Sequence, residues 1–566
     1  MVIPNFAKTP KYGLPYLRNS DFAKDIGTHS KAIAETFETL ISSGTFKGDP
    51  GARGLPGMNA VAADTAVGAY LGDPESRSRA ALEAWWEEQD TSPGTWVSVM
   101  DHGAKADGTT DDLNAFTAAI AAAQATAGGR VFVPAGTYRV RSAIVLPSHT
   151  TLQGAGMGNT KIKLSNTAAQ DTWVITNAGR PTRTGAKFIT VRDMDLDWNR
   201  TGRTVPDWTE SPKTGGSRGS ALCFSKVEYA WIERVRAHNS RLHAFDITSE
   251  GRVGNDPYDY LEYNYPGDMA IDDSPGPSRF VWMLDCEATD FGDDGITTHH
   301  SEWLWIRNCY SHHPWNRDNC NGIEIDDGSR LVFLENNLTF GCYAGIEIKA
   351  HASSPAAQRI TITGHMSFKD CRSYNWRHIG HHSATDPNSK SAVSIVASNL
   401  VAMYPTNEYG FQGEATPRAL AISAFRDVSI NGFMGVGLGG YPGGAAVTIQ
   451  YKAQFVTIEG ITLRGFTGMD HDIYLFGGDN RPDRCNISGV TIAQSANNGI
   501  GLGSDISRCN ISGVQLQGRA IAGTYGIKTS ASGNNLYGFQ VTSYENAMDV
   551  AGTKSNERAY FRGGAA

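Results

Sequence analysis

The stretch CYAGIEIKAH, residues 342–351, holds the pattern that decides the fold. Apolar and charged side chains alternate in it, because Glu347 follows Ile346 and Lys349 follows Ile348. Successive side chains of a β-strand point to opposite faces of the sheet. The pattern therefore predicts a strand that buries its two isoleucines and directs a carboxylate and an ammonium group to the other face.

Related stretches recur along the chain, each a short alternation bounded by turn residues. They are HAFDITSE (243–250), DGITTHHS (294–301), NGIEIDDG (321–328), DIYLFGG (472–478), NGIGLGS (498–504), YGIKTSA (525–531) and NAMDVAG (546–552). Several successive intervals are 21–27 residues long. A regular period of this size is typical of a solenoid, and the local period of two indicates β-strands. The sequence therefore predicts an all-β chain that winds into stacked coils.

Composition narrows the class of protein. The 566 residues carry a net charge of −8 and include 63 glycines, which suits a large fold with many tight turns. An acidic chain makes a general nucleic-acid surface unfavourable. We find no apolar run near the roughly 20 residues that span a membrane, and no apolar leader in MVIPNFAKTPKYGLPYL, residues 1–17. We therefore expect no nucleic-acid partner, no membrane span and no secretory signal peptide.

Most of the eight cysteines are predicted to be small buried side chains. Cys286, Cys309 and Cys371 follow what look like equivalent strands, so equal positions in successive coils would stack inside the core. A disulfide framework is a weaker interpretation in a long, cysteine-poor chain. A zinc site is weaker still, because no Cys-x-x-Cys pair occurs.

The N-terminal region differs from the coils. Residues 20–43 read as a helix with an apolar stripe, and GDPGARGLPG, residues 48–57, holds three Gly-X-Y triplets. Only glycine fits at the axis where three collagen-like chains meet. We predict a trimerisation segment over 1–60 and a helical linker over 61–95, with a flexible linker as the alternative for the triplets.

The region after residue 95 carries the clearest family resemblance. GAKADGTTDD (103–112), an Ala-rich helix from Asp112 to Ala127 and GGRVFVPAGTY (128–138) follow one another. Together they resemble the start of the pectate-lyase-like right-handed parallel β-helix of phage tail spikes and depolymerases. The resemblance implies a catalytic β-helix over 96–552 and a C-terminal cap over 553–566. We expect the helix to cover the open edge of the first coil.

The N-terminal residues carry a second resemblance. The triplets and NAVAADTAVGAYLGDP, residues 59–74, are similar to the front of minor tail proteins from phages of actinobacteria. This implies a homotrimer on the virion tail, made in the host cytoplasm and joined through its N-terminus to tail or baseplate proteins. The substrate implied is a bacterial surface polysaccharide at the host cell.

Stacking the repeats predicts two columns of side chains on the outer face of the coils. Adjacent strands lie about 4.8 Å apart, so residues of equal register become neighbours. The first column is Asp246, Thr297, Glu324 and Glu347, and the second is Thr248, His299, Asp326 and Lys349. An ion-paired ladder that stabilises the sheet is the alternative interpretation.

The columns predict carboxyl groups in different protonation states. Glu324 stacks on Glu347, and like charges disfavour ionisation of both, so one of the two is a candidate acid. Asp326 lies between His299 and Lys349, which favour its ionised form, so it is a candidate base or nucleophile. Glycoside hydrolysis needs such a pair, and its carboxyl separation decides between retention and inversion. The sequence leaves that choice open.

A paired-Asp turn adds further candidates. GDDGITTHH, residues 292–300, resembles in part the paired-Asp motif of polygalacturonase-like hydrolases, with turn capping as the alternative. Long insertions at 198–218, 251–278 and 399–418 are expected to border a binding face. The predicted catalytic residues are Glu324, Asp326, Glu347, Asp294 and Asp246. The predicted substrate-binding residues are His299, His300, Lys349, Asp293, Asp327, His313, Trp315, Trp208 and Tyr260.

Three functions remain open at this point. The leading prediction is an endo-acting glycoside hydrolase with no cofactor and no metal. A polysaccharide lyase is the first alternative, with His299 and Lys349 acting on a uronic acid and the Asp-rich turns able to hold Ca²⁺. A non-catalytic adhesin that binds glycans through the aromatic residues of its loops is the second.

Overall fold

The computed structural model describes residues 96–550 apart from 126–127, 181, 183, 204–218, 250–275, 351–353, 383–387, 413–414 and 531. The chain divides into two compact units, Met1–Gly94 and Thr95–Ala566. The predicted segments 1–60, 61–95 and 553–566 lie outside the described residues, as do Trp208 and Tyr260. No helix among the described residues is long and apolar enough to cross a membrane.

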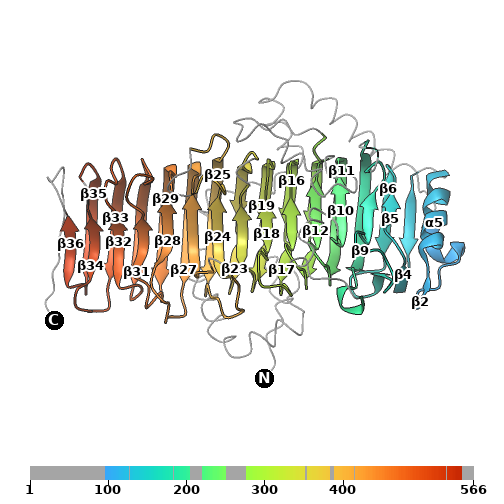
Figure 1. Ribbon diagram of the computed structural model, residues 1–566, viewed down its shortest axis with the longest axis horizontal. Coiled ribbons are helices and arrows are strands. Elements are labelled where there is room, and N and C mark those ends of the chain that lie inside the picture. The colour runs from blue at the N-terminus through green and yellow to red at the C-terminus, as the bar shows by residue number, and fades with distance from the viewer. Residues whose placement is uncertain are drawn as a thin grey trace, which may run out of the picture. The chain divides into compact units, whose positions relative to one another are not determined.

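The described residues form two parallel sheets that wind as stacked coils (Figure 1). Sheet A has 22 strands: β1 (Val97–Ser98), β2 (Asp107–Asp111), β3 (Arg130–Val133), β4 (Gly136–Val140), β6 (Thr150–Gly154), β7 (Thr160–Leu164), β9 (Ala186–Asp197), β11 (Val227–His238), β13 (Arg279–Leu284), β14 (Glu287–Thr289), β16 (Glu302–Arg307), β17 (Tyr310–His312), β19 (Arg330–Glu335), β20 (Leu338–Phe340), β22 (Gln358–Thr363), β23 (Met366–Phe368), β25 (Val393–Met403), β27 (Arg426–Val436), β29 (Gln454–Arg464), β31 (Asn486–Ala493), β33 (Asn510–Gln517) and β35 (Asn535–Thr542).

Sheet B has 14 strands, and one or two strands of sheet A separate each of them from the next along the chain. They are β5 (Ile144–Leu146), β8 (Ile175–Asn177), β10 (Leu222–Ser225), β12 (Phe245–Thr248), β15 (Ile296–Thr298), β18 (Ile323–Ile325), β21 (Ala344–Ile348), β24 (Arg372–Arg377), β26 (Arg418–Ser423), β28 (Ala445–Gln450), β30 (His471–Leu475), β32 (Asn498–Leu502), β34 (Tyr525–Thr529) and β36 (Asn546–Val550). The predicted parallel β-helix is confirmed.

A helical cap closes the first coil (Figure 1). Helix α5 (Leu113–Ala125) follows the short 3₁₀ helix η2 (Val99–His102) and buries Phe116 and Ile120 in the core. It confirms the helix predicted from the Ala-rich stretch. The buried Asp112 carboxylate accepts hydrogen bonds from the backbone N–H groups of Lys105 and Ala106 at 2.7 and 3.2 Å. The cap thereby protects an edge that could pair with another chain.

Sheet A bends at one residue of each coil, and this corner residue has a left-handed backbone conformation. Its φ is positive in twelve successive coils, at Asp193, Arg234, Asp285, Asn308, Asn336, Gly364, Asn399, Gly432, Gly460, Gly489, Gly513 and Gly538. Asn, Asp and Gly reach this conformation at little cost, which explains the Asn and Gly spacing in the sequence. Each coil therefore turns at the same place, and the columns of side chains stay in register.

The eight cysteines are all free and buried, as predicted. Their stacking differs in one respect from the prediction. Cys286 and Cys309 are neighbours at the corner of sheet A, but Cys371 lies beside Cys342, whose carbonyl accepts a hydrogen bond from the Cys371 N–H. The expected single column is wrong, because Cys371 precedes a strand of sheet B rather than following the first strand of sheet A.

A ladder of stacked aromatic rings covers part of the outer face of sheet A. Successive centroids lie 5.1 Å apart for Trp231 and Trp282, 5.0 Å for Trp282 and Trp305, and 5.3 Å for Trp305 and Phe333. The interplanar angles are 6–11°, so each ring covers the face of the next. This arrangement stabilises the sheet and leaves mainly ring edges toward solvent.

Candidate active site

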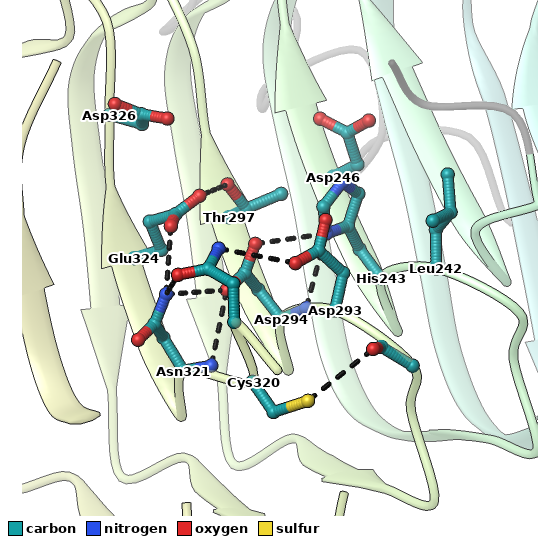
Figure 2. Close-up of polar contacts among 12 residues, drawn as sticks. Leu242, His243, Asp246, Asp293, Asp294, Thr297, Cys320, Asn321, Glu324 and Asp326 are labelled. Carbon is teal, nitrogen blue, oxygen red and sulfur yellow. Dashed lines mark hydrogen bonds and ion pairs between the residues drawn. The ribbon is translucent and has the colours of Figure 1, made fainter. Parts of the chain in front are cut away.

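The first predicted column is confirmed by the pairing of sheet B. Asp246 is paired with Thr297, Thr297 with Glu324, and Glu324 with Glu347. These residues belong to β12, β15, β18 and β21, four successive strands of the sheet. Figure 2 shows Asp246, Thr297 and Glu324 on one face, with Asp293, Asp294 and Asn321 at the nearby turns.

The second predicted column places His299 and Lys349 on either side of Asp326. One carboxylate oxygen of Asp326 lies 3.8 Å from His299 Nε2 and 3.9 Å from Lys349 Nζ. The other ring nitrogen of His299 lies 3.5 Å from Asp246 Oδ1. His299 therefore connects a carboxylate of the first column with one of the second.

These charged groups are buried, although their side chains point away from the interior of the coil. The exposed fraction is 0% for Asp246, 2% for Glu324 and 0% for Glu347. An outward direction of the side chain therefore does not make these three residues exposed. Each buried charge needs a partner of opposite charge or several hydrogen bonds, since otherwise its desolvation would oppose folding.

Glu324 is surrounded by donors. Lys349 Nζ lies 2.6 Å from its Oε1, Thr297 Oγ1 donates to Oε2 at 3.1 Å, and Asn321 Nδ2 donates to Oε1 at 2.8 Å. Burial opposes ionisation, but the charge of Lys349, a hydrogen bond from Asp294 and the charge of His299 hold the pKa of Glu324 below its ordinary value. Burial likewise disfavours the charge of Lys349, but Glu324 raises the pKa of Lys349 well above its ordinary value. The pair is ionic.

The expected competition between the two glutamates does not make Glu324 an acid. Glu347 has its own partners, with Arg377 Nε at 2.7 Å from Oε1 and Asn375 Nδ2 donating to Oε2 at 2.6 Å. Lys349 lies against Glu324 and lowers its pKa, so repulsion by Glu347 does not decide its protonation. The prediction that this repulsion controls Glu324 is therefore wrong.

The paired aspartates have the opposite tendency. Burial, followed by the charge of Glu324, raises the pKa of Asp294 well above its ordinary value. Burial also raises the pKa of Asp293, against the influence of His243. Asp294 is fully buried, whereas Asp293 is half-buried. Of the two acids that tend to stay protonated, Asp293 is thus the one with access to solvent.

The contacts of Asp294 extend to neighbouring coils. His243 Nδ1 lies 3.1 Å from its Oδ2, and the Asn321 side-chain and backbone N–H groups donate to Oδ1 at 2.9 and 3.2 Å (Figure 2). Asn319 Nδ2 donates to Asp293 Oδ1 at 3.2 Å. These bonds cross between turns, so capping of its own turn does not account for the pair.

His243 and Asn321 were missed by the sequence analysis. Both occupy the turn just before a strand of sheet B, and Asp294 has the equivalent position in the coil between them. Ala244 N–H donates to Asp294 O, and Gly295 N–H donates to Asn321 O, so the three turns are stacked. The predicted columns start at Asp246, Thr297 and Glu324, so they leave out the turn that precedes each strand. The residues three positions earlier are His243, Asp294 and Asn321, and the same stacking argument applied to them predicts that they are neighbours.

The other predicted binding residues have mostly local contacts. His300 N–H donates to Asp327 O at 2.6 Å, and both residues are buried at the ends of their strands. Trp315 Nε1 donates to Ser240 O at 2.8 Å and anchors the turn before sheet B. The ring of His313 lies 4.8 Å from that of Phe340. Their roles in substrate binding stay predictions.

Two groups of side chains have the composition of a metal site. His243, Asp293 and Asp294 form one group, and His299, Glu324 and Asp326 form the other, with potential ligand atoms within 4.8 Å of one another. In the second group, Lys349 already supplies a positive charge 2.6 Å from Glu324. A divalent cation there would have to displace this ammonium group, so the lysine competes with metal binding.

A family model described as "Rhamnogalacturonase A/epimerase, pectate lyase-like" matches residues 96–347. This span includes all five predicted catalytic residues. A shorter match joins the chain to the mannuronan C5-epimerase AlgE6 of Azotobacter vinelandii, at 41% identity over 156 residues, which cover 26% of this chain and 17% of that protein.

Longer matches lead to bacteriophage proteins. The pre-neck appendage protein of Bacillus phage phi29 is 41% identical over 500 residues, which cover 85% of this chain and 55% of that relative. The chain thus spans about half the length of this curated relative. The crystal structure of the phage phi29 gene product 12 N-terminal fragment has 39% sequence identity and a TM-score of 0.71, and the match covers 85% of this chain and 76% of that one.

These matches confirm the predicted resemblance to phage proteins with a pectate-lyase-like β-helix, while an actinobacterial host stays a prediction. The curated relative and the solved structure each match 85% of this chain. The chain belongs to the pectate-lyase-like family of phage appendage proteins.

Proposed function

We propose that this protein is an endo-acting glycoside hydrolase that cleaves a bacterial surface polysaccharide. The observation that carries the proposal is the opposite protonation tendency of two neighbouring acids. Burial raises the pKa of Asp293, whereas the charge of Lys349 and a hydrogen bond from Asp294 lower the pKa of Glu324 despite burial. A protonated and an ionised carboxyl group in one site are what acid-assisted cleavage of a glycosidic bond requires.

The proposed reaction assigns a role to each group. Asp293 donates its proton to the glycosidic oxygen as the bond to the anomeric carbon breaks. The negative charge of Glu324 stabilises the oxocarbenium-like transition state, and Asp326 accepts a proton from the attacking water. Lys349 and His299 orient the carboxylates, and Asp246 lies behind His299. One water molecule is consumed, and a new reducing end forms.

The test uses polysaccharide extracted from host cells, with reducing ends and polymer mass measured over time. Asp293→Asn and Glu324→Gln should each lower the rate by about 10²–10⁴-fold, the usual contribution of a positioned acid or charge. Glu459→Gln, on the exposed outer face of sheet A, is the matched control and should keep the wild-type rate. Wild-type rates in both site variants would contradict the assignment.

A polysaccharide lyase is the second candidate, favoured by the family description and by the short match to an epimerase. In that reaction His299 would remove the proton next to a uronic acid carboxylate, which Lys349 would neutralise. The product carries a new C=C bond and absorbs ultraviolet light, whereas the hydrolase product does not. A non-catalytic adhesin would bind the polymer without shortening it, so polymer mass separates the three candidates.

The curated relative that matches 85% of this chain is a phage pre-neck appendage protein, and for this chain we propose a place on the virion tail, acting at the host cell surface. Three parallel copies joined through residues 1–60, and their attachment to tail proteins, belong to this proposal. Sedimentation of the full chain should give a trimer. A monodisperse monomer at micromolar concentration would contradict the assembly without affecting the chemistry.

A further inference from the structure

We infer that sheet B carries a second glycan contact, an aromatic platform formed by His471, Tyr474 and Phe476, which binds the sugar rings of a long chain whose cleaved bond lies at Glu324. This inference rests on the proposed function for the nature of its ligand. It adds a binding site to the catalytic one and predicts that the protein prefers long chains to short ones.

Register places the platform on the same face as the candidate active site. Tyr474 of β30 is paired with Thr448 on one side and Gly501 on the other. The strand order of sheet B continues this column back to Glu324 of β18, five strands away. At the usual strand spacing the two positions are about 24 Å apart, so a chain of several sugars can touch both.

The rings of His471 and Tyr474 lie against the backbone of Gly501, which has no side chain. A Cβ atom at Gly501 would come within 2.7 Å of Tyr474 Cδ2 and 2.8 Å of His471 Cδ2. The two ring centroids are 4.6 Å apart, and the Phe476 ring meets that of Tyr474 edge to face at 4.8 Å. All three side chains are half-buried, so part of their aromatic surface is open to solvent.

The platform differs from the aromatic ladder of sheet A. Trp282 is stacked between Trp231 and Trp305, and these neighbours occupy both of its faces. The strands beside Tyr474 place Thr448 and Gly501 in its column, so neither adjacent strand brings an aromatic residue into its register. The face of an aromatic ring is electron-rich and attracts the C–H groups of a pyranose ring, which carry partial positive charge. The expected ligand is therefore a chain of pyranose sugars.

The residues between Glu324 and the aromatic platform suit a sugar chain that lies along sheet B. In the first column, Glu347 is followed by Asn375, Ala421 and Thr448 before Tyr474 is reached. These side chains are short compared with the aromatic residues that follow. Burial also lowers the pKa of His471 to about 4, so the platform carries no imidazolium charge at neutral pH. Neutral rings match a contact through sugar C–H groups.

The experiment measures binding in the Glu324→Gln background, which protects the ligand from cleavage. The probes are host surface polysaccharide, intact or cut by mild acid to fragments of two or three sugars. Calorimetry gives the ratio of the two affinities. Tyr474→Ala should lower this ratio about tenfold, the effect of losing one good aromatic contact, and Tyr474→Phe should keep most of it. Tyr537→Ala, at a residue 50% exposed in sheet A, is the control and should leave the ratio unchanged.

The outcomes separate this inference from the proposed function. An unchanged affinity ratio in Tyr474→Ala would overturn the inference even if both affinities fell, because the contact would then not depend on chain length. Circular dichroism confirms that each variant is folded. If the wild-type protein does not shorten the polymer but Tyr474→Ala still lowers the ratio, the hydrolase proposal fails and the platform stands.

Discussion

On the outer faces of sheets A and B, residues of equal register stack in the same way, but the kinds of residue that stack are different. In sheet A the ladder repeats one kind of residue, since Trp231, Trp282 and Trp305 succeed one another at 5.0–5.1 Å. In sheet B the residue changes from coil to coil, and the acids Glu324 and Glu347 each have a separate cation. Like rings gain from stacking, whereas like charges oppose it. A column that repeats one kind of residue therefore indicates a structural role. A column in which the residue changes and charges are buried indicates a catalytic or binding role.

The largest effect on stability is expected from removing the cation of sheet B. Lys349→Met leaves Glu324 buried without its partner and should lower the free energy of unfolding by about 3–5 kcal/mol at neutral pH. The loss should shrink as the pH falls, because Glu324 then takes up a proton. Thermal unfolding between pH 5 and 8 measures this. Lys528→Met, which removes an exposed pair with Asp549, is the control, and a pH-independent loss would contradict the ionic pair.

Asp472 tests whether a residue that differs in type from its neighbours in a column always has a function. Its neighbours in the column are Ala446, Gly499 and Gly526, and burial raises its pKa to about 7. Because the folded state binds the proton more tightly, the free energy of unfolding should fall between about pH 4 and pH 7, by on the order of 3–4 kcal/mol from this group. Asp472→Asn should flatten this dependence and stabilise the protein above pH 7.

Chemical denaturation at several pH values measures the effect, with Asp470→Asn as the control, since Asp470 is exposed. A wild-type pH dependence in Asp472→Asn would show that another group controls it. Loss of depolymerisation in Asp472→Asn would extend the functional face well beyond β21. Unchanged depolymerisation would limit the rule drawn from the two sheets to columns whose buried acids have a cation beside them, as Glu324 and Glu347 do.

The aromatic ladder should matter for stability and not for chemistry. Trp282→Ala removes a ring from the middle of the stack and should lower the free energy of unfolding by about 2–3 kcal/mol, less than for a fully buried tryptophan. Trp282→Phe should retain most of the stability. The rate per folded molecule should stay at the wild-type value, and a large fall in that rate would break the distinction between the two faces.

The smallest effect is expected at the C-terminal end of the same column of sheet A. Asn510 Nδ2 donates to Asn486 Oδ1 at 2.6 Å, and Asn535 Nδ2 donates to Asn510 Oδ1 at 2.7 Å. These three asparagines lie at the surface, so Asn510→Ala should lower the free energy of unfolding by about 1 kcal/mol. Gln515→Ala in the same strand, with an exposed side chain, is the control for chain truncation alone.

The sequence predicts the coil and its columns because a period of two and a spacing of 21–27 residues are written directly in the order of residues. It predicts the order Asp246, Thr297, Glu324, Glu347, which the pairing confirms. It does not predict which acid holds a proton. That depends on side-chain reach, since Lys349 approaches Glu324 in the preceding coil, and on burial that an outward direction does not imply.

The one-residue corner of sheet A has a consequence for how such proteins diverge. Asn308, Asn336 and Gly364 turn the chain with no room for added length, because one further residue would reverse the direction of every side chain that follows. The long connections instead join the sheets, as between β9 and β10 and between β12 and β13. Both ends of sheet B can therefore gain or lose residues while the columns keep their phase. Natural selection can thus vary the border of the site for a new host while the coil is inherited unchanged.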